Sequence, residues 1–456
     1  MGLVKPDGLK KNKVLDLVTL AAVAAILGLT PVLVNLTHAV PAKGPDKNPT
    51  VLIIFLTLLA LITLTSLVGV FGMATKRLSE PAAKDRLTAF GLNYFNVLCK
   101  VLAGLFLISG FVKLQDPVGF GYKLDDYWDF FYGLTEAFPA DMMKALSVPI
   151  AAFVSVFEVA LGFALITGYQ MRSTSWLLVL MLLFFTLLTG LAAFTGKLQD
   201  CGCFGDALKL EPWQTFAKDL ILLIPGFLIL LHRRRIHPYY NRPLPGFASF
   251  GSFLICAGLS LYCYWHLEFL DFRGAYKVGQ DLCYNSTHAG EDGEIFAHDF
   301  SFPPETAPVF CDRDFCKGPW LLIVMYDMED HAREPYDKAA ELVSSLKKQA
   351  PGINVVGGTN TGPSARKKMN LKFEEDFCWN DFDQKVVRTI IRSTPGFVLV
   401  QDGIVQKKWH HNDMPTVEKL KEMVGAAADV APVVDTPTMD STATDSSALD
   451  SASHNP

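Results

Sequence analysis

Seven predominantly apolar stretches dominate the first 267 residues of the 456-residue chain. An α-helix needs about 20 apolar residues to cross the hydrocarbon core of a bilayer. The stretches are Leu15–Leu36, Val51–Met73, Leu92–Val112, Val148–Gly168, Thr174–Gly196, Trp213–Leu231 and Phe247–Leu267. The first stretch is longer than the apolar part of a signal peptide, so we interpret it as a retained anchor. The sequence therefore predicts an α-helical bundle of about seven spans within a lipid bilayer.

The lysines and arginines of the short loops predict the orientation of these spans. With the N-terminus inside, the inner loops carry 13 of these residues and the outer loops carry 7. We therefore predict a multi-pass protein of the cell (inner) membrane with a cytoplasmic N-terminus and an extracytoplasmic C-terminal part. The outer segment Tyr122–Phe138 mixes aromatic and acidic residues, which is typical of an interfacial helix. The chain has no dense basic tract, so nucleic acid is not an expected partner.

The loop between the fifth and sixth predicted spans contains the pair Cys201-Gly202-Cys203. Because a disulfide across so small a ring is strained and easily reduced, the pair favours thiol–disulfide exchange over a structural role. One alternative is that each cysteine pairs elsewhere, for instance with Cys283 or Cys311. A metal site is the other alternative, but no histidine lies nearby in the sequence. The remaining cysteines of the membrane region lie in apolar runs, where cysteine behaves as a small buried hydrophobe.

The loop also carries a resemblance to a known family. Residues 196–206, with the sequence Gly-Lys-Leu-Gln-Asp-Cys-Gly-Cys-Phe-Gly-Asp, are similar to the signature loop of the MauE/DoxX redox-associated membrane proteins. Leu107–Pro117 resembles the end of that family's first helix, and Phe157–Gly162 resembles its second helix. The resemblance covers residues 92–232. It implies a four-helix unit that handles disulfides or electrons for exported proteins, often beside a thioredoxin-like partner.

Polar residues within the predicted spans are candidates for function. A charged carboxylate such as Glu158 costs about 3 kcal/mol at the centre of a bilayer, so it should be paired or face the bundle interior. Lys113 is the expected partner, with Asp116 beside it. The pair either orders the helices or serves as a proton relay or quinone site. We interpret Lys218 and Asp219 as interfacial residues at the start of the sixth span.

After Leu267 the sequence changes to short strands and amphipathic helices, which predicts a soluble domain over residues 268–425. Residues 1–91 would then add two spans to the four-helix unit, and residues 233–267 a cytoplasmic loop and the last span. An Asp-Gly pair between alternating segments predicts a β-hairpin. The expected elements are strands at 321–326, 353–356, 397–401 and 404–409 and helices at 334–349, 364–371 and 414–424. Residues 426–456 have the composition of a disordered tail.

This order of elements, with Pro395 just before the hairpin, resembles a thioredoxin fold. In that family the proline is cis and lies against the reactive disulfide, so the resemblance implies a cis Thr394–Pro395 bond. The family's Cys-x-x-Cys motif is missing, because residues 327–332 read Asp-Met-Glu-Asp-His-Ala. We therefore expect a degenerate thioredoxin-like domain that binds or docks rather than one that oxidises thiols by itself.

Three further cysteines of this region have expected roles. Cys311 and Cys316 are close in sequence, and we predict a disulfide between them. Cys378 either pairs with Cys283 or accepts electrons from the membrane cysteines, and the sequence leaves both open. Neither a haem motif nor a phosphate-binding loop is present, so a quinone is the one cofactor considered.

The leading hypothesis is a membrane thiol–disulfide or electron-transfer component that acts on exported cysteine-containing or thioredoxin-like proteins. In it, Cys201 and Cys203 carry the exchange, and a quinone resets the pair through the bundle. A scaffold protein with a substrate-binding thioredoxin-like domain is the first alternative. A subunit of a quinol-oxidising respiratory complex is the second, and it follows from the family resemblance alone.

Overall fold

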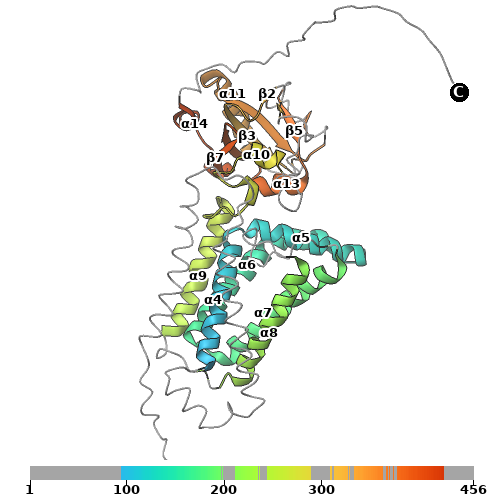
Figure 1. The fold of residues 1–456 in the computed structure, drawn as a ribbon, viewed down its shortest axis with the longest axis vertical. Coiled ribbons are helices and arrows are strands. Elements are labelled where there is room, and N and C mark those ends of the chain that lie inside the picture. The colour runs from blue at the N-terminus through green and yellow to red at the C-terminus, as the bar shows by residue number, and fades with distance from the viewer. Residues whose placement is uncertain are drawn as a thin grey trace, which may run out of the picture.

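The computed structural model describes residues 94–196, 198, 211–234, 236, 244–288, 309–310, 313–326, 328, 333–362, 366–367, 369, 373 and 377–425. These residues form a helical bundle with a mixed α/β domain stacked on one of its ends (Figure 1). The predicted N-terminal spans, Leu15–Leu36 and Val51–Met73, lie outside the described residues. The predicted tail, 426–456, also lies outside them.

Five helices in the described part are long and apolar enough to cross a membrane. They are α4 (Tyr94–Gln115), α6 (Ala140–Thr167), α7 (Met171–Thr195), α8 (Pro212–His232) and α9 (Leu244–Trp265). They correspond to the last five predicted spans. Large apolar side chains such as Phe153, Leu187, Phe194 and Leu231 remain exposed on the outside of the bundle, where lipid would cover them. The chain is therefore a multi-pass membrane protein.

Close packing joins α4 to α6. A Cβ atom on Gly110 would lie 2.7 Å from Cγ2 of Val159, and one on Gly162 would lie 2.9 Å from the Leu107 side chain. Small residues at such positions let two membrane helices approach each other, because lipid supplies no hydrophobic force between them. Two buried polar residues, Lys113 and Glu158, lie on this interface.

Helix α5 (Pro117–Leu134) corresponds to the predicted interfacial helix and lies across the bundle end that faces the α/β domain (Figure 1). It starts at Pro117. Proline lacks a backbone N–H, but the first N–H groups of a helix have no partner within the helix, so no hydrogen bond is lost. The Asp116 side chain accepts a hydrogen bond of 2.8 Å from the Gly119 N–H and so caps the first turn. Phe120 and Leu124 are buried against the bundle. Helix α5 therefore forms a layer between the spans and the domain.

The α/β domain is built on a mixed five-stranded sheet in the order β5-β4-β3-β6-β7. β3 pairs in parallel with β4 and antiparallel with β6, and it is buried along its whole length. The strands are β3 (Pro319–Met325), β4 (Asn354–Thr359), β5 (Trp379–Asp381), β6 (Gly396–Gln401) and β7 (Ile404–Trp409). The helices are α10 (Leu282–Thr287), α11 (Arg333–Gln349), α13 (Gln384–Ile390) and α14 (Val417–Val424). A separate pair, β1 (Val309–Phe310) and β2 (Arg313–Asp314), forms a two-stranded ladder.

The predicted hairpin is confirmed, with β6 and β7 antiparallel and Asp402 and Gly403 both at positive φ in the turn. Strand β5 and helix α13 were not predicted from the sequence. Helix α13 begins after Asp383, whose side chain accepts a hydrogen bond from the Lys385 N–H. An aspartate at this position is typical of the start of a helix. The aromatic residues that precede it in the sequence do not follow a helical pattern, so the helix was not recognised.

The segment that joins α9 to the sheet is held by buried charges. Arg273 forms ion pairs with Glu268 and with Asp271, and its guanidinium donates to the Ile390 carbonyl at 3.2 Å. The buried Lys408 ammonium of β7 lies 2.8 Å from the other oxygen of Asp271. We call these contacts of Arg273, Asp271 and Lys408 the clamp. The clamp fixes the domain to the segment that follows α9.

Lys408 gives the clamp a pH dependence. Burial outweighs the nearby Asp271 carboxylate and lowers the pKa of Lys408 to about 7. Above pH 7 the unfolded chain keeps a proton that the folded chain releases, so this group adds stability as the pH rises from about 7 towards 10. We expect the Lys408→Met variant to show a flatter increase of the unfolding midpoint between pH 6.5 and pH 9 than the unsubstituted chain. Differential scanning calorimetry in detergent measures it, with the exposed neighbour Lys407→Met as control. If the unfolding midpoint rises equally with pH in both variants, the pH dependence does not come from Lys408.

Candidate functional site

The structure brings Lys113 of α4 and Glu158 of α6 together inside the bundle. The Lys113 ammonium lies 2.7 Å from Oε2 of Glu158, and both side chains are almost fully buried. Lys113 also donates to the Ser109 hydroxyl at 2.9 Å and lies 4.4 Å from the centre of the Phe185 ring. The negative charge of Glu158 is therefore compensated by a lysine that also contacts Ser109 and Phe185.

A second ion pair lies nearby and was not expected there. The Lys218 ammonium lies 2.5 Å from Oδ1 of Asp219, and Thr189 of α7 donates to Oδ2 at 2.9 Å. Lys218 and Asp219 are 6% and 2% exposed, so both lie inside the bundle rather than on its surface. They lie almost two turns inside α8, where ionisable residues mark a buried site.

Both ion pairs line one small cavity between α4, α6, α7 and α8. Its volume is about 20 Å³, which is room for one water molecule. An engineered cavity that binds benzene measures about 150 Å³. The cavity therefore suits a water or a proton between two carboxylates, and it does not fit the ring of a quinone.

Asp116 is not part of this cavity. It caps α5, and its Oδ2 lies 3.1 Å from the Arg392 guanidinium of the α/β domain. The expectation that it would lie beside the Glu158 pair is therefore corrected. The position of Asp116 at the start of α5 points its carboxylate away from the bundle and towards the domain.

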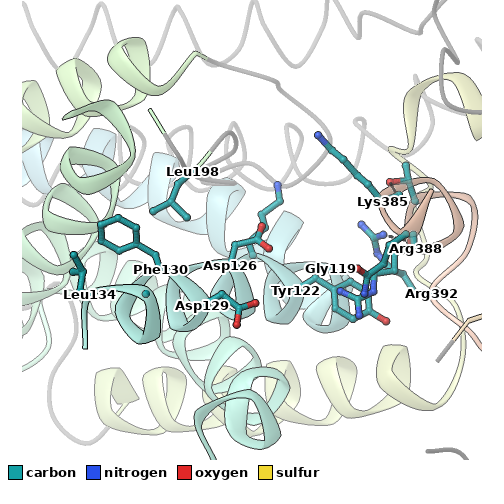
Figure 2. Close-up of a pocket in the computed structure, with 14 residues that line it drawn as sticks. Gly119, Tyr122, Asp126, Asp129, Phe130, Leu134, Leu198, Lys385, Arg388 and Arg392 are labelled. Carbon is teal, nitrogen blue, oxygen red and sulfur yellow. Dashed lines mark hydrogen bonds between the residues drawn. The ribbon is translucent and has the colours of Figure 1, made fainter. Parts of the chain in front are cut away.

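A larger pocket of about 570 Å³ lies at the junction between the bundle and the domain, and we call it the junction pocket. Figure 2 shows it running along α5, from Phe130, Leu134 and Leu198 at one end to Arg388 and Arg392 at the other. Asp126 and Asp129 lie between these ends. The pocket thus has an apolar end, an acidic middle and a basic end.

Electrostatic contacts shape the basic end of the junction pocket. Arg388 lies over the Tyr122 ring at 4.3 Å, which is a cation–π contact. Burial raises the pKa of Asp126, and the neighbouring Asp125 raises it further, while Arg388 lowers it. Asp126 therefore holds its proton more readily than a free aspartate does.

The candidate catalytic residues Cys201 and Cys203 lie outside the described residues. Leu198, three residues before Cys201, is buried and packs in a cluster with Tyr127 and Ala192. Leu198 also lines the junction pocket, so the described residue nearest in sequence to Cys201 on its N-terminal side lies at this pocket.

The peptide bond between Thr394 and Pro395 is cis, the geometry that the sequence led us to expect. The Thr394 hydroxyl accepts from the Tyr326 N–H at 3.1 Å and donates to the Tyr326 carbonyl at 2.9 Å. The Tyr326 hydroxyl in turn lies 3.2 Å from that of Tyr122 on α5. Burial raises the pKa of Tyr326 well above its usual range. The cis proline therefore lies on the part of the domain that meets the membrane unit.

The predicted disulfide between Cys311 and Cys316 is wrong, because Cys316 is bonded to Cys283. The bond joins α10 to the turn before β3, two segments 33 residues apart that the fold brings together. Cys378 is also in a disulfide, and its expected pairing with Cys283 is excluded by the same bond. Cysteines with free thiols in the described part are Cys99, Cys256 and Cys263, all buried.

The described residues contain no group of three or more His, Cys, Asp or Glu side chains that could hold a metal ion. The basic residues Lys385 and Arg388 of α13, and Arg392 just after it, were not predicted as site residues. The spacing of three residues puts Lys385 and Arg388 on one face of the helix, which was a usable signal once α13 was recognised.

Comparisons with known proteins agree with the membrane unit. Residues 92–232 match the family model described as methylamine utilisation protein MauE. No curated protein and no solved structure matches the chain.

Proposed function

We propose, from the premise that residues 92–232 form a MauE-type membrane unit, that the chain is a thiol–disulfide exchange component for exported proteins. In this proposal Cys201 and Cys203 are the reacting thiols. The observation that carries it is the position of Leu198, which ties the start of the cysteine loop to a pocket walled by both halves of the protein. The disulfide-bonded α/β domain is consistent with an oxidising compartment on that side of the membrane.

One round of thiol–disulfide exchange conserves electrons and protons without a further cofactor. A thiolate of the partner attacks the Cys201–Cys203 disulfide, and a mixed disulfide forms as the first bond breaks. The second partner thiol then releases a partner disulfide and leaves Cys201 and Cys203 as thiols, which take up the two protons. The reverse sequence reduces a partner disulfide. A dithiol partner of the thioredoxin-like class suits both directions.

The two buried ion pairs support a role in proton movement. Glu158 and Asp219 face one cavity that has room for a water molecule, and each carboxylate is held by a lysine. In our proposal they exchange protons with the bundle end that carries the cysteine loop. Because a quinone ring does not fit the cavity, we assign no step to a quinone.

We propose that the α/β domain, with its strand order β5-β4-β3-β6-β7 and its cis Thr394–Pro395 bond, is thioredoxin-like and docks partners rather than oxidises them. The described cysteines of its sheet region, Cys283, Cys316 and Cys378, are all in disulfides, so none offers a thiol. This observation also favours the second candidate function, an assembly or scaffold protein. In that case Cys201 and Cys203 would be structural.

Trapping of mixed disulfides separates these functions. The Cys203→Ala and Cys201→Ala variants remove the resolving thiol, so at least one should accumulate covalent, dithiothreitol-sensitive adducts with exported proteins on non-reducing gels. Cys263→Ala, which removes a buried free thiol of α9, is the matched control and should yield none. If neither loop variant forms adducts and both retain the function of the unsubstituted chain, the scaffold function is supported and the exchange function is refuted.

A further inference from the structure

A pocket of about 530 Å³ lies at the end of the bundle away from the α/β domain, and we call it the arginine pocket. It forms between the first turn of α7 and the last turn of α8, which run side by side (Figure 1). Its lining residues are Arg172, Ser173, Trp176, Leu177, Arg233 and Arg234. It shares no described lining residue with the ion-pair cavity or the junction pocket, so we treat its role as separate from the proposed exchange.

The charged residues that line the arginine pocket, among those that the structure describes, are three arginines, with no acidic residue beside them. Arg233 donates to the Leu230 carbonyl at 2.8 Å, and none of the three arginines forms an ion pair within the part of the chain that the structure describes. Like charges this close repel each other within one Debye length, which is about 8 Å at physiological salt. The site is therefore electrostatically complementary to an anion.

The remaining lining residues belong to a lipid-facing surface. Trp176 is 53% exposed and Leu177 is 40% exposed, and both lie on the first turns of an apolar span. Tryptophan is enriched at the level of lipid headgroups, where its ring contacts acyl chains and its N–H reaches polar groups. Because the arginines lie at the ends of the spans Met171–Thr195 and Pro212–His232, they share this level. A ligand here would have an anionic head and an apolar tail.

We propose that the arginine pocket binds the phosphate headgroup of an anionic phospholipid. Arginine presents a planar fork of donors that matches phosphate oxygens, and it is weakly hydrated compared with lysine. Basic pockets between membrane helices bind such headgroups in other membrane proteins. A phospholipid held between Arg172 of α7 and Arg234, two residues past the end of α8, would join the two helices between which the cysteine loop lies in the sequence.

The proposal is tested on the full chain in neutral detergent by native mass spectrometry, with dioleoylphosphatidylglycerol or dioleoylphosphatidylcholine added at matched concentrations. We expect tighter binding of phosphatidylglycerol. The double variant Arg172→Gln/Arg234→Gln should weaken that binding about 30-fold, because each arginine near a lipid surface contributes about a fivefold change. The control Lys144→Gln/Lys338→Gln removes two positive charges elsewhere and should leave the binding unchanged.

Three results would overturn the proposal. One is equal binding of the two lipids by the unsubstituted chain, which needs no variant to fold. Another is full displacement of phosphatidylglycerol by millimolar glycerol phosphate, which would identify the ligand as a free phosphate and not a lipid. If the arginine variant binds phosphatidylglycerol as tightly as the lysine control, the site lies elsewhere and the proposal also fails.

Discussion

Replacing Lys113 with methionine is expected to destabilise the membrane unit by about 3–5 kcal/mol, because it leaves a buried carboxylate without its partner. The Lys113 ammonium lies 2.7 Å from Glu158, whose side chain is 4% exposed. The carboxylate cannot turn to water, and Ser109 cannot replace the lost charge. Reversible unfolding in detergent by titration with sodium dodecyl sulfate measures the effect.

A double variant shows how much of this cost comes from the unpaired charge. In Lys113→Met/Glu158→Leu both charges are gone and apolar side chains fill the site, so we expect stability within about 1 kcal/mol of the unsubstituted chain or above it. The control is Lys144→Met, which breaks an exposed ion pair with Asp129 and should cost at most about 1 kcal/mol. A loss in Lys113→Met no larger than in this control would show that the buried pair is not formed in the membrane.

The same variants separate a structural pair from a proton relay. If the double variant regains stability and also retains thiol exchange, the pair only orders the helices. If it regains stability but exchange slows while trapped adducts accumulate, Glu158 handles protons in the reaction. Glu158→Gln keeps the shape of the side chain and should show the same slowing if the relay operates.

Removing the Cys283–Cys316 disulfide is expected to destabilise the α/β domain by about 4 kcal/mol. The cysteines are 33 residues apart, and closing a loop of this length restricts the unfolded chain by about that amount. For a domain of this size the unfolding midpoint should fall by roughly 10 °C. Calorimetry of the Cys283→Ala/Cys316→Ala variant measures the shift.

Two features make this measurement specific. The transition of the membrane unit should stay in place, because neither cysteine contacts the bundle core. Cys256→Ala/Cys263→Ala, which removes two buried free thiols of α9, changes the same number of sulfur atoms without breaking a disulfide. If the midpoint of the α/β domain stays unchanged in the Cys283→Ala/Cys316→Ala variant, the pairing is wrong.

The spans were predictable from sequence because a membrane helix needs only a local property, a long apolar run. The Asp402-Gly403 hairpin was predictable for a similar reason, since its residues fix the turn themselves. The ion pair of Lys113 with Glu158 was suggested by the cost of a lone charge in lipid, although 45 residues separate the two. In each of these cases one physical requirement allows only a few local structures.

Pairings that depend on how elements meet in space were not predictable. Cys316 has Cys311 as its sequence neighbour, yet the fold brings α10 and Cys283 to it. Asp116 was expected beside Lys113, three residues before it in the sequence, but the start of α5 turns it towards Arg392. The junction pocket depends on the seating of α13 over α5, and no local pattern encodes that contact.

The contact between Tyr122 and Tyr326 makes α5 a tethered competitor for the domain surface beside Thr394. Because α5 and the domain belong to one chain, this contact forms at any protein concentration. A partner that binds the same surface has to displace α5 first, so its apparent affinity is lowered by the fraction of molecules in which the contact is formed.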